Sequence, residues 1–207
     1  MAIESIGIRR LLDRAAIYTY LMNKLSTKAG KKFVREFVDF YEGCWVLDIG
    51  CGPANILKSV SFEINYTGID LNPEYITTAT KNFGEIGNFY LMNVEDLSSK
   101  SNEKYDRILI LGTLHHLSNE QIEGLLRVTS TLLNENGVLV THDPIRSSKQ
   151  NVISRILMDL DRGKHIRQIS EHISLFEKYF EISYCVRDDI MKFPYQIMYV
   201  RGTRKSN

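Results

Sequence analysis

The stretch VLDIGCGPAN, residues 46–55, decides the fold of this chain. It reads as an apolar strand ending in an acid, then two glycines separated by one residue, then a helix opened by Pro53. Gly50 and Gly52 let the backbone approach a ligand closely, and unpaired amides at a helix start favour an anionic group. Asp48 is itself an anion and cannot bind that group, so we expect the ligand to carry a cation as well. A zwitterion joined to a nucleoside would satisfy both. Such glycine turns are also common without any ligand.

The sequence on both sides of this loop alternates short apolar runs with helical stretches. The expected parallel strands are CWVLDI (44–49), YTGID (66–70), NFYLMN (88–93), YDRILIL (105–111) and GVLVTH (137–142). This alternation is typical of a parallel sheet with helices on its faces. Two late strands, YFEISYCVRD (179–188) and PYQIMYVRG (194–202), indicate an antiparallel pair that closes the sheet.

The starts of the helices give a stronger local signal than their apolar spacing. Pro73 follows Asn72, which places proline at the first helical position after a permissive cap. Ser118 precedes Gln121 by three residues, a capping box that opens a helix over 119–133.

The end of that helix region and the later helices are also marked. Asn136-Gly137 predicts the left-handed turn before the next strand. Further helices are expected over 147–163 and 169–180. No Pro-, Gly- or Ser-rich linker, repeat or low-complexity tract interrupts the 207 residues, which indicates one domain.

Charge and composition exclude several classes of protein. The 26 Lys and Arg against 25 Asp and Glu leave a net charge of +1, whereas a nucleic-acid binder normally has a strongly basic domain. No apolar run approaches the roughly 20 residues of a membrane span, and the N-terminus lacks the apolar segment of a signal peptide. We therefore expect a cytoplasmic protein that binds neither nucleic acid nor membrane. Cys44, Cys51 and Cys185 include no CxxC pair and are expected as buried thiols.

Asp70 ends the second expected strand, 18 residues after Gly52. An acid at this place in an open α/β sheet accepts the hydroxyls of a ribose. Because Asn72 and Pro73 follow, the same acid is also typical of a helix cap. With the glycine loop it predicts an adenosine-containing ligand. The third glycine of a dinucleotide fingerprint is Asn55 here, which argues against a nicotinamide cofactor.

The chain resembles the class I S-adenosylmethionine-dependent methyltransferases through four ordered motifs, VLDIGCGPA (46–54), GIDLNP (68–73), NVEDLS (93–98) and YDRILILGTLHHLS (105–118). DRGKHIR (161–167) and FPYQIMYVR (193–201) are similar to small bacterial members with unassigned substrates. The resemblance implies a Rossmann-like, doubly wound, mainly parallel seven-stranded sheet with an antiparallel final strand pair. It also implies S-adenosylmethionine as cofactor and S-adenosylhomocysteine as product.

On this resemblance the single domain, 1–207, divides into three parts. Residues 1–42 form a helical N-terminal extension or lid, 43–145 the cofactor-binding core, and 146–207 the late helices and closing strands. A methyl transfer needs donor and nucleophile aligned with water excluded, which is the reason for expecting a lid.

The resemblance also assigns the cofactor-binding residues. Asp48, Gly50, Cys51 and Gly52 form the loop that holds the methionine amino and carboxylate ends. The remaining positions are the ribose acid, the residues around adenine and the strand-four exit, namely Asp70, Leu71, Asn93, Val94, Glu95, Leu111 and Gly112. Asn93 replaces the usual Asp and would accept from the adenine amine without charge assistance. NVED could equally be only a polar strand-to-helix turn.

On the acceptor side, His115 and His116 follow the fourth strand and are candidate catalytic bases for a hydroxyl proton. The alternative for this pair is packing or capping. No metal-ligand pattern accompanies them, so we expect no metal. The strand-four exit also lacks the Asn-Pro-Pro-aromatic signature of amino methylation on nucleic-acid bases.

Four basic residues lie close together at the end of the first late helix and just after it, namely Arg162, Lys164, His165 and Arg167. They suggest an anionic small-molecule acceptor, oriented by Arg162 and Arg167. The alternative is a solvated helix end whose cations complement the last carbonyls.

The leading function is therefore a methyltransferase acting on a small biosynthetic molecule at a hydroxyl oxygen. The alternatives are a nicotinamide-dependent oxidoreductase and a non-catalytic adenosylmethionine-binding regulator. The sequence predicts neither the acceptor nor the oligomeric state.

Overall fold

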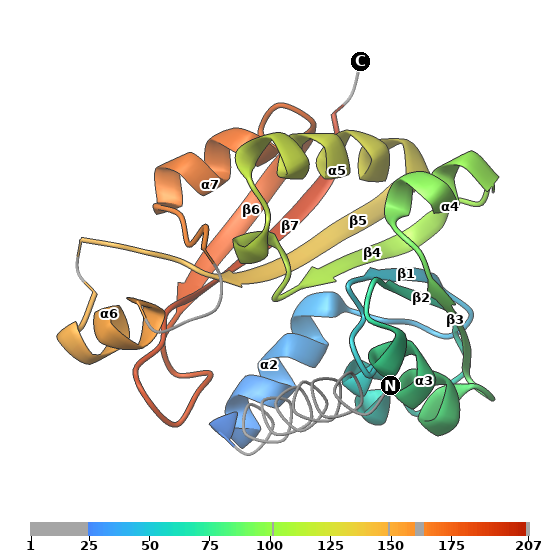
Figure 1. Ribbon diagram of the computed structural model, residues 1–207, viewed down its shortest axis with the longest axis horizontal. Helices are drawn as coiled ribbons and strands as arrows, with labels where there is room; N and C mark the ends of the chain where they lie inside the picture. The colour runs from blue at the N-terminus through green and yellow to red at the C-terminus, as the bar shows by residue number, and fades with distance from the viewer. Residues whose placement is uncertain (1–24, 101, 149, 160–163, 206–207) are drawn as a thin grey trace, which may run out of the picture.

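A seven-stranded sheet with the strand order β3-β2-β1-β4-β5-β7-β6 forms the centre of the molecule (Figure 1). The computed structural model describes residues 25–100, 102–148, 150–159 and 164–205. The expectations for 1–24 and for Arg162 lie outside these residues. The strands are β1 Trp45–Ile49, β2 Asn65–Asp70, β3 Gly87–Leu91, β4 Tyr105–Leu111, β5 Leu133–Pro144, β6 Phe180–Arg187 and β7 Ile197–Arg204.

The pairing of the strands confirms the expected fold class. β1 to β5 are parallel neighbours, and β7 lies antiparallel between β5 and β6. Because the strand order reverses at β1 and β4, the carboxyl ends of these two strands meet at the switch point where ligands bind in open α/β sheets.

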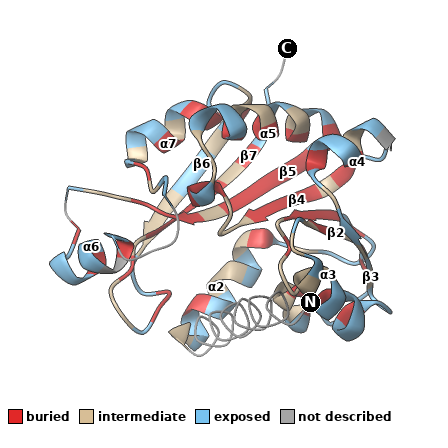
Figure 2. Cartoon of the chain, viewed as in Figure 1, coloured by how far each residue is buried: buried red, intermediate tan, exposed pale blue. Residues whose placement is uncertain are grey.

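Helices cover both faces of the sheet (Figure 1). The α-helices are α2 Lys28–Val38, α3 Pro73–Phe83, α4 Val94–Lys100, α5 Asn119–Leu132, α6 Val152–Asp159 and α7 Ile169–Phe176, and two short 3₁₀-helices are η1 Asn55–Ser59 and η2 Leu114–His116. One core packs α4, α5 and α7 against the sheet, and a second packs α2, α3 and η1 against the other face. The central strands β4 and β5 are accordingly mostly buried, while the edge strands β3 and β6 are mostly half-buried or exposed (Figure 2). Within the described ranges, no helix is long and apolar enough to span a bilayer.

Two of the expected helix starts are confirmed. The side chain of Asn72 accepts a hydrogen bond from Glu74 N, with Pro73 in the first turn of α3. Ser118 and Gln121 form both hydrogen bonds of the capping box at α5.

Two other local predictions are wrong. Pro53 opens no α-helix, because the chain turns once more and forms only the five-residue η1. Asn136-Gly137 makes no left-handed turn, since α5 ends at Leu132 and β5 begins at once, with both residues inside the strand. A Cβ on Gly137 would lie 2.7 Å from the carbonyl oxygen of Tyr105, so close strand packing explains this glycine.

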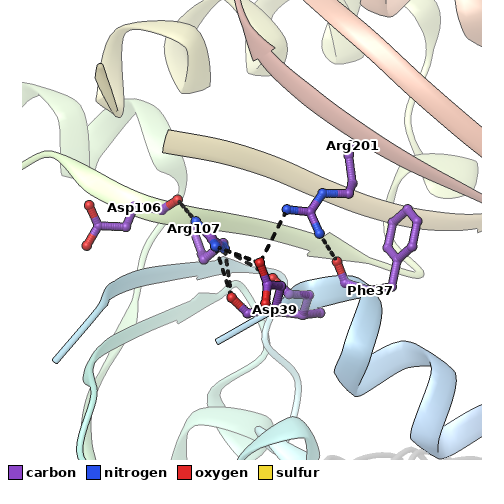
Figure 3. Close-up of polar contacts among 6 residues, drawn as sticks. Phe37, Asp39, Asp106, Arg107 and Arg201 are labelled. Atoms are coloured by element: carbon purple, nitrogen blue, oxygen red, sulfur yellow. Dashed lines mark hydrogen bonds and ion pairs between the residues drawn. The ribbon is translucent and has the colours of Figure 1, made fainter. Parts of the chain in front are cut away.

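The described part of the N-terminal extension is fastened to the sheet (Figure 3). Arg107 on β4 donates to the carbonyl oxygens of Val38 and Asp39 at the end of α2, and also to the Asp39 carboxylate. Arg201 on β7 donates to the Phe37 carbonyl at 2.8 Å and lies 3.8 Å from the same carboxylate. These cations satisfy carbonyls that a helix end leaves unpaired. α2 is therefore part of the scaffold.

Candidate active site

A cavity of about 740 Å³ opens at the carboxyl ends of β1, β2 and β4. Of the residues expected to bind the cofactor or act in catalysis, nine line it, namely Gly50, Gly52, Asp70, Leu71, Asn93, Val94, Glu95, Gly112 and His116. Asp48, Cys51, Leu111 and His115 do not line it. The structure thus brings most of the expected residues together around one space.

The glycine loop is shaped by contacts with neighbouring strand ends. Gly50 has φ +72°, and a Cβ there would lie 2.5 Å from the hydroxyl oxygen of Thr113. The amides of Gly50 and Cys51 both donate to the carbonyl oxygen of Ile69. Because η1 is a short 3₁₀-helix, the expected anion site at an α-helix start is not formed. Open loop amides would have to bind an anion instead.

Asp70 is held in place by two backbone amides. Its Oδ2 accepts from Gly52 N at 2.9 Å, and its Oδ1 accepts from Asn72 N at 2.8 Å. The N-cap of α3 is Asn72, and Asp70 supports the start of this helix by accepting from the amide of Asn72. Each carboxylate oxygen keeps a further lone pair that can accept a hydroxyl from the cavity.

Asp48 lies beneath the glycine loop and is almost fully buried. The Tyr66 hydroxyl donates to its Oδ2 at 2.5 Å. Burial raises the pKa of Asp48 to about 7, the Tyr66 hydrogen bond opposes this, and the charge of Asp70 adds to it. With a pKa of about 7, the carboxyl is present in both its protonated and its ionised form near neutral pH. A cation nearby would favour the ionised form.

Two of the three thiols are buried, as the sequence analysis expected. Cys44 and Cys51 are buried, whereas Cys185 is half-buried. The Cys51 thiol donates to the Gly52 carbonyl, and burial raises its pKa. Its sulfur lies 3.0 Å from the position of a Cβ on Gly68, so Cys51 packs under the loop instead of facing the cavity.

The third motif forms a strand-to-helix turn that also faces the cavity. Asn93 Oδ1 accepts from Asp96 N at 2.7 Å at the start of α4. Val94 is buried and Glu95 is exposed, and both line the cavity. The NVED turn therefore has a capping role, and the side-chain amide group of Asn93 keeps donors for a ligand.

The two adjacent histidines lie in different surroundings. His115 is buried, and its Nδ1 lies 2.7 Å from Asp143 Oδ1, which also accepts from the His115 amide at 3.1 Å. His116 lines the cavity, and its ring lies 4.1 Å from that of His115. Only His116 of this pair is placed to touch a ligand in the cavity.

Arg167 does not orient an acceptor, so that prediction is wrong. The side chain is 5% exposed and donates to the carbonyl oxygens of Leu114, Leu117 and His165 and to the Asn119 side chain. Arg167 therefore ties the late segment to the loop after β4. Among the described residues of that cluster, Lys164 and His165 are exposed. An anionic acceptor stays a proposal.

Sequence reasoning missed part of the cavity wall. The additional lining residues include Tyr75 from α3 and, on either side of η2, Thr113 and Leu117. The first turns of α5 add Glu120, Gln121, Gly124 and Leu125. The capping box at Ser118 marked where α5 begins, but the direction in which its first turn faces depends on packing over the sheet. Among the described residues, no group of three His, Cys, Asp or Glu side chains could hold a metal ion.

Comparisons with known proteins agree with this geometry. A family model described as a methyltransferase domain matches residues 46–137. The chain is similar to N-terminal Xaa-Pro-Lys N-methyltransferase 1 of Xenopus tropicalis, with 27% identity over 159 residues covering 70% of each protein. It is also similar to the ubiquinone biosynthesis O-methyltransferase of Rickettsia canadensis, with 29% identity over 57% of this chain and 50% of that protein. A solved plantazolicin methyltransferase with bound S-adenosylhomocysteine has the same fold, with a TM-score of 0.64 and 17% identity over 85% of each chain.

Proposed function

We propose that this chain, which belongs to the class I S-adenosylmethionine-dependent methyltransferases, methylates a small biosynthetic molecule at a hydroxyl oxygen. The cofactor is S-adenosylmethionine and the product is S-adenosylhomocysteine. The matched family model and both relatives are methyltransferases, so the alternative of a nicotinamide-dependent oxidoreductase is not supported.

The residues around the cavity fit this cofactor. Outside Gly52 and its two chain neighbours, no described atom lies within 4 Å of the place where a Cβ on Gly52 would stand, so the loop leaves room for a ligand. Asp70 can accept the two ribose hydroxyls through its remaining lone pairs. Leu71, at 73% exposure in the cavity wall, offers an apolar face for adenine. When bound, adenosylmethionine supplies an electrophilic methyl group on a cationic sulfonium.

Asp48 is our candidate for the ammonium end of the methionine. The carboxylate is buried beneath the loop and has the Tyr66 hydroxyl as its hydrogen-bond donor. A second, cationic donor would complete its hydrogen bonding and offset the unfavourable burial of its charge. The chain's contribution to the reaction is then mainly alignment, because the displacement at the methyl group needs donor and nucleophile in line.

The acceptor proposal rests on one observation, the presence of imidazole in the wall of a cavity sized for small molecules. A volume of about 740 Å³ lies within the range of small-molecule sites. His116 lies in that wall. A hydroxyl must lose its proton as the methyl group arrives, and imidazole can accept a proton near neutral pH. The likeness to an O-methyltransferase supports the same choice.

Transfer of a radiolabelled methyl group tests the proposal. The purified chain is incubated with labelled adenosylmethionine and two sets of probes, small phenols and sugars on one side and a peptide beginning Xaa-Pro-Lys on the other. We expect label on a hydroxyl compound. Label on the peptide amine alone would show that the chain follows its N-methyltransferase relative instead.

A further inference from the structure

Asn93 lies in the cavity wall at the exit of β3, beside the end of β2 that carries the proposed ribose acid. β2 and β3 are parallel neighbours, and their register places Asp70 beside Leu91, two residues before Asn93. Leu71, which follows Asp70, lines the same cavity. A ribose held by Asp70 would therefore direct its base along Leu71 towards Asn93.

Asn93 also begins α4. Its carbonyl oxygen accepts from Leu97 N at 3.3 Å, and its Oδ1 accepts from Asp96 N at 2.7 Å. These are the contacts of an N-cap residue, whose side-chain oxygen pairs an amide that the first turn of a helix leaves free. The helix that follows therefore fixes the side chain of Asn93.

The partner of Oδ1 decides which end of the side-chain amide is left for a ligand. A backbone N–H can only donate, so the Asn93 atom that faces Asp96 N must be the oxygen. The other atom is then Nδ2, which carries two hydrogens and makes no hydrogen bond with the described residues. Because Asn93 is exposed and lines the cavity, these donors are within reach of a bound base.

A donor at this place does not suit the amino group of adenine, which is itself a donor. A carboxylate has two oxygens, so an aspartate could cap α4 and accept from the amine at the same time. Asn93 has one side-chain oxygen, so accepting from the amine would cost the cap. The two ring nitrogens that flank the amine, N1 and N7, are acceptors and suit Nδ2.

We propose that Asn93 recognises the purine by donating from Nδ2 to N1 or N7, and that the 6-amino group is not required for binding. This inference rests on the proposed function, with adenosylmethionine bound in this cavity. It reverses the direction of the hydrogen bond that the resemblance implied for Asn93. The site should therefore also bind nucleosides whose purine has no amino group at the 6-position.

Glu95 is the other side chain of this turn that could accept from the amine. It lines the cavity and is exposed. Fixing a long, solvated side chain for one hydrogen bond costs conformational entropy. Asn93, by contrast, is already fixed by its cap. The observations thus favour Asn93 as the residue that contacts the base.

Calorimetry with S-adenosylhomocysteine and three altered forms of it tests the assignment without an acceptor. Removing the 6-amino group should change the dissociation constant by less than about threefold, since Asn93 does not use the amine. Replacing N1 or N7 by C–H removes an acceptor, and one of these two forms should bind about tenfold more weakly. The proposal is overturned if loss of the amine weakens binding about tenfold, or if both ring nitrogens can be replaced without loss.

Asn93→Asp should invert this order, because the carboxylate keeps the cap and offers a second acceptor. Loss of the amine should then weaken binding about tenfold, and neither ring nitrogen should be needed. Asn88→Asp is the matched control, since Asn88 is exposed on β3 and does not line the cavity. Asn88→Asp and Glu95→Gln should both keep the wild-type order. A wild-type order in Asn93→Asp would show that Asn93 does not face the base.

Hydrogen exchange at the Asp96 amide reports on the cap itself. The amide should exchange no faster in the S-adenosylhomocysteine complex than in the free chain, because Oδ1 stays on Asp96 N. Faster exchange on binding would mean that Oδ1 turns to the ligand, which overturns the proposal. If S-adenosylhomocysteine itself does not bind, the proposed function fails and this inference falls with it. That outcome differs from binding with the amine required.

Discussion

Two groups of charged residues in this molecule, one around the buried Arg107 and one around the buried Asp143, differ in how fully they are paired. Around Asp39, every side-chain nitrogen of Arg107 donates to an oxygen of the protein, and Arg201 adds a further bond to the end of α2 (Figure 3). Around Asp143, by contrast, Asp143 Oδ2 and His142 Nδ1 are buried without a partner among the described residues.

The difference separates structure from function on physical grounds. A satisfied buried charge stabilises the fold, since removing it leaves its partners unpaired. An unsatisfied buried group destabilises the fold and persists only where something else depends on it. The first cluster holds α2 on the sheet, and the second lies at the end of β5, next to the end of β4 that borders the cavity. Each can be altered without touching the other.

The largest effect should come from breaking the satisfied cluster. Arg107→Leu removes a buried guanidinium and leaves the carbonyls of Val38 and Asp39 unpaired, so the free energy of unfolding should fall by about 3 kcal/mol. Arg201→Leu, whose side chain is 28% exposed, is the matched control and should lose only about 1 kcal/mol. Urea denaturation measures both. Equal losses would mean that burial of Arg107 carries no special weight.

At the cavity, a substitution is expected to weaken ligand binding much more than it lowers the stability of the fold. Asp70→Ala leaves the ribose hydroxyls unpaired, so binding of adenosylhomocysteine should weaken by about 1–3 kcal/mol, while unfolding changes by about 1 kcal/mol or less. Asp70→Asn keeps one acceptor oxygen and should lose less. Isothermal titration calorimetry checks the affinities. Unchanged binding in the alanine variant removes Asp70 from the site.

Asp48 should make both stability and binding depend on pH. Its pKa is raised to about 7 in the fold, against about 3.9 in an unfolded chain, so the folded state keeps a proton that the unfolded state loses between these values. The free energy of unfolding should therefore fall as pH rises through this window. Binding of the methionine ammonium needs the ionised carboxylate, so affinity should rise between pH 6 and pH 8, by up to about tenfold per unit below the pKa.

Asp48→Asn should remove the contribution of this carboxyl to the pH dependence of both quantities, which calorimetry at several pH values would measure. Tyr66→Phe removes the hydrogen bond that lowers the pKa of Asp48. The pH range over which the affinity rises should therefore move to higher pH. An unchanged pH dependence of the affinity in Tyr66→Phe would contradict the role given to that hydrogen bond.

Much of the fold could be predicted because it is encoded locally. The strand over 105–111 and the capping box at Ser118 depend on neighbours in sequence, and both were predicted with the bounds that the structure has. The glycine loop and Asp70 were predicted for the same reason, since each follows a strand directly. The five-residue η1 was not predicted, because Pro53 suits the first turn of either kind of helix.

The unpredicted features depend on contacts between distant segments. Arg167 reaches carbonyl oxygens about fifty positions earlier in the chain, and nothing in its own neighbourhood distinguishes it from a surface cation. The pairing of His142 with Tyr199 depends on an antiparallel register between strands that are far apart in the sequence. Arg107 did carry a usable signal, because a cation inside the apolar run YDRILIL needs a partner if the strand is central.

The smallest predicted effect concerns a further buried group on β5 without a hydrogen-bond partner among the described residues, the hydroxyl of Thr141. Thr141 and Thr129 are both fully buried, but Thr129 Oγ1 donates to the Leu126 carbonyl at 3.0 Å, whereas Thr141 Oγ1 has no partner among the described residues. Valine has nearly the same shape as threonine. Thr129→Val should therefore lower the free energy of unfolding by about 1 kcal/mol, while Thr141→Val should leave it unchanged or raise it by about 0.5 kcal/mol, since a desolvated hydroxyl is lost. Urea denaturation of both variants decides this, and an equal loss in the two would show that Thr141 has a partner in solution.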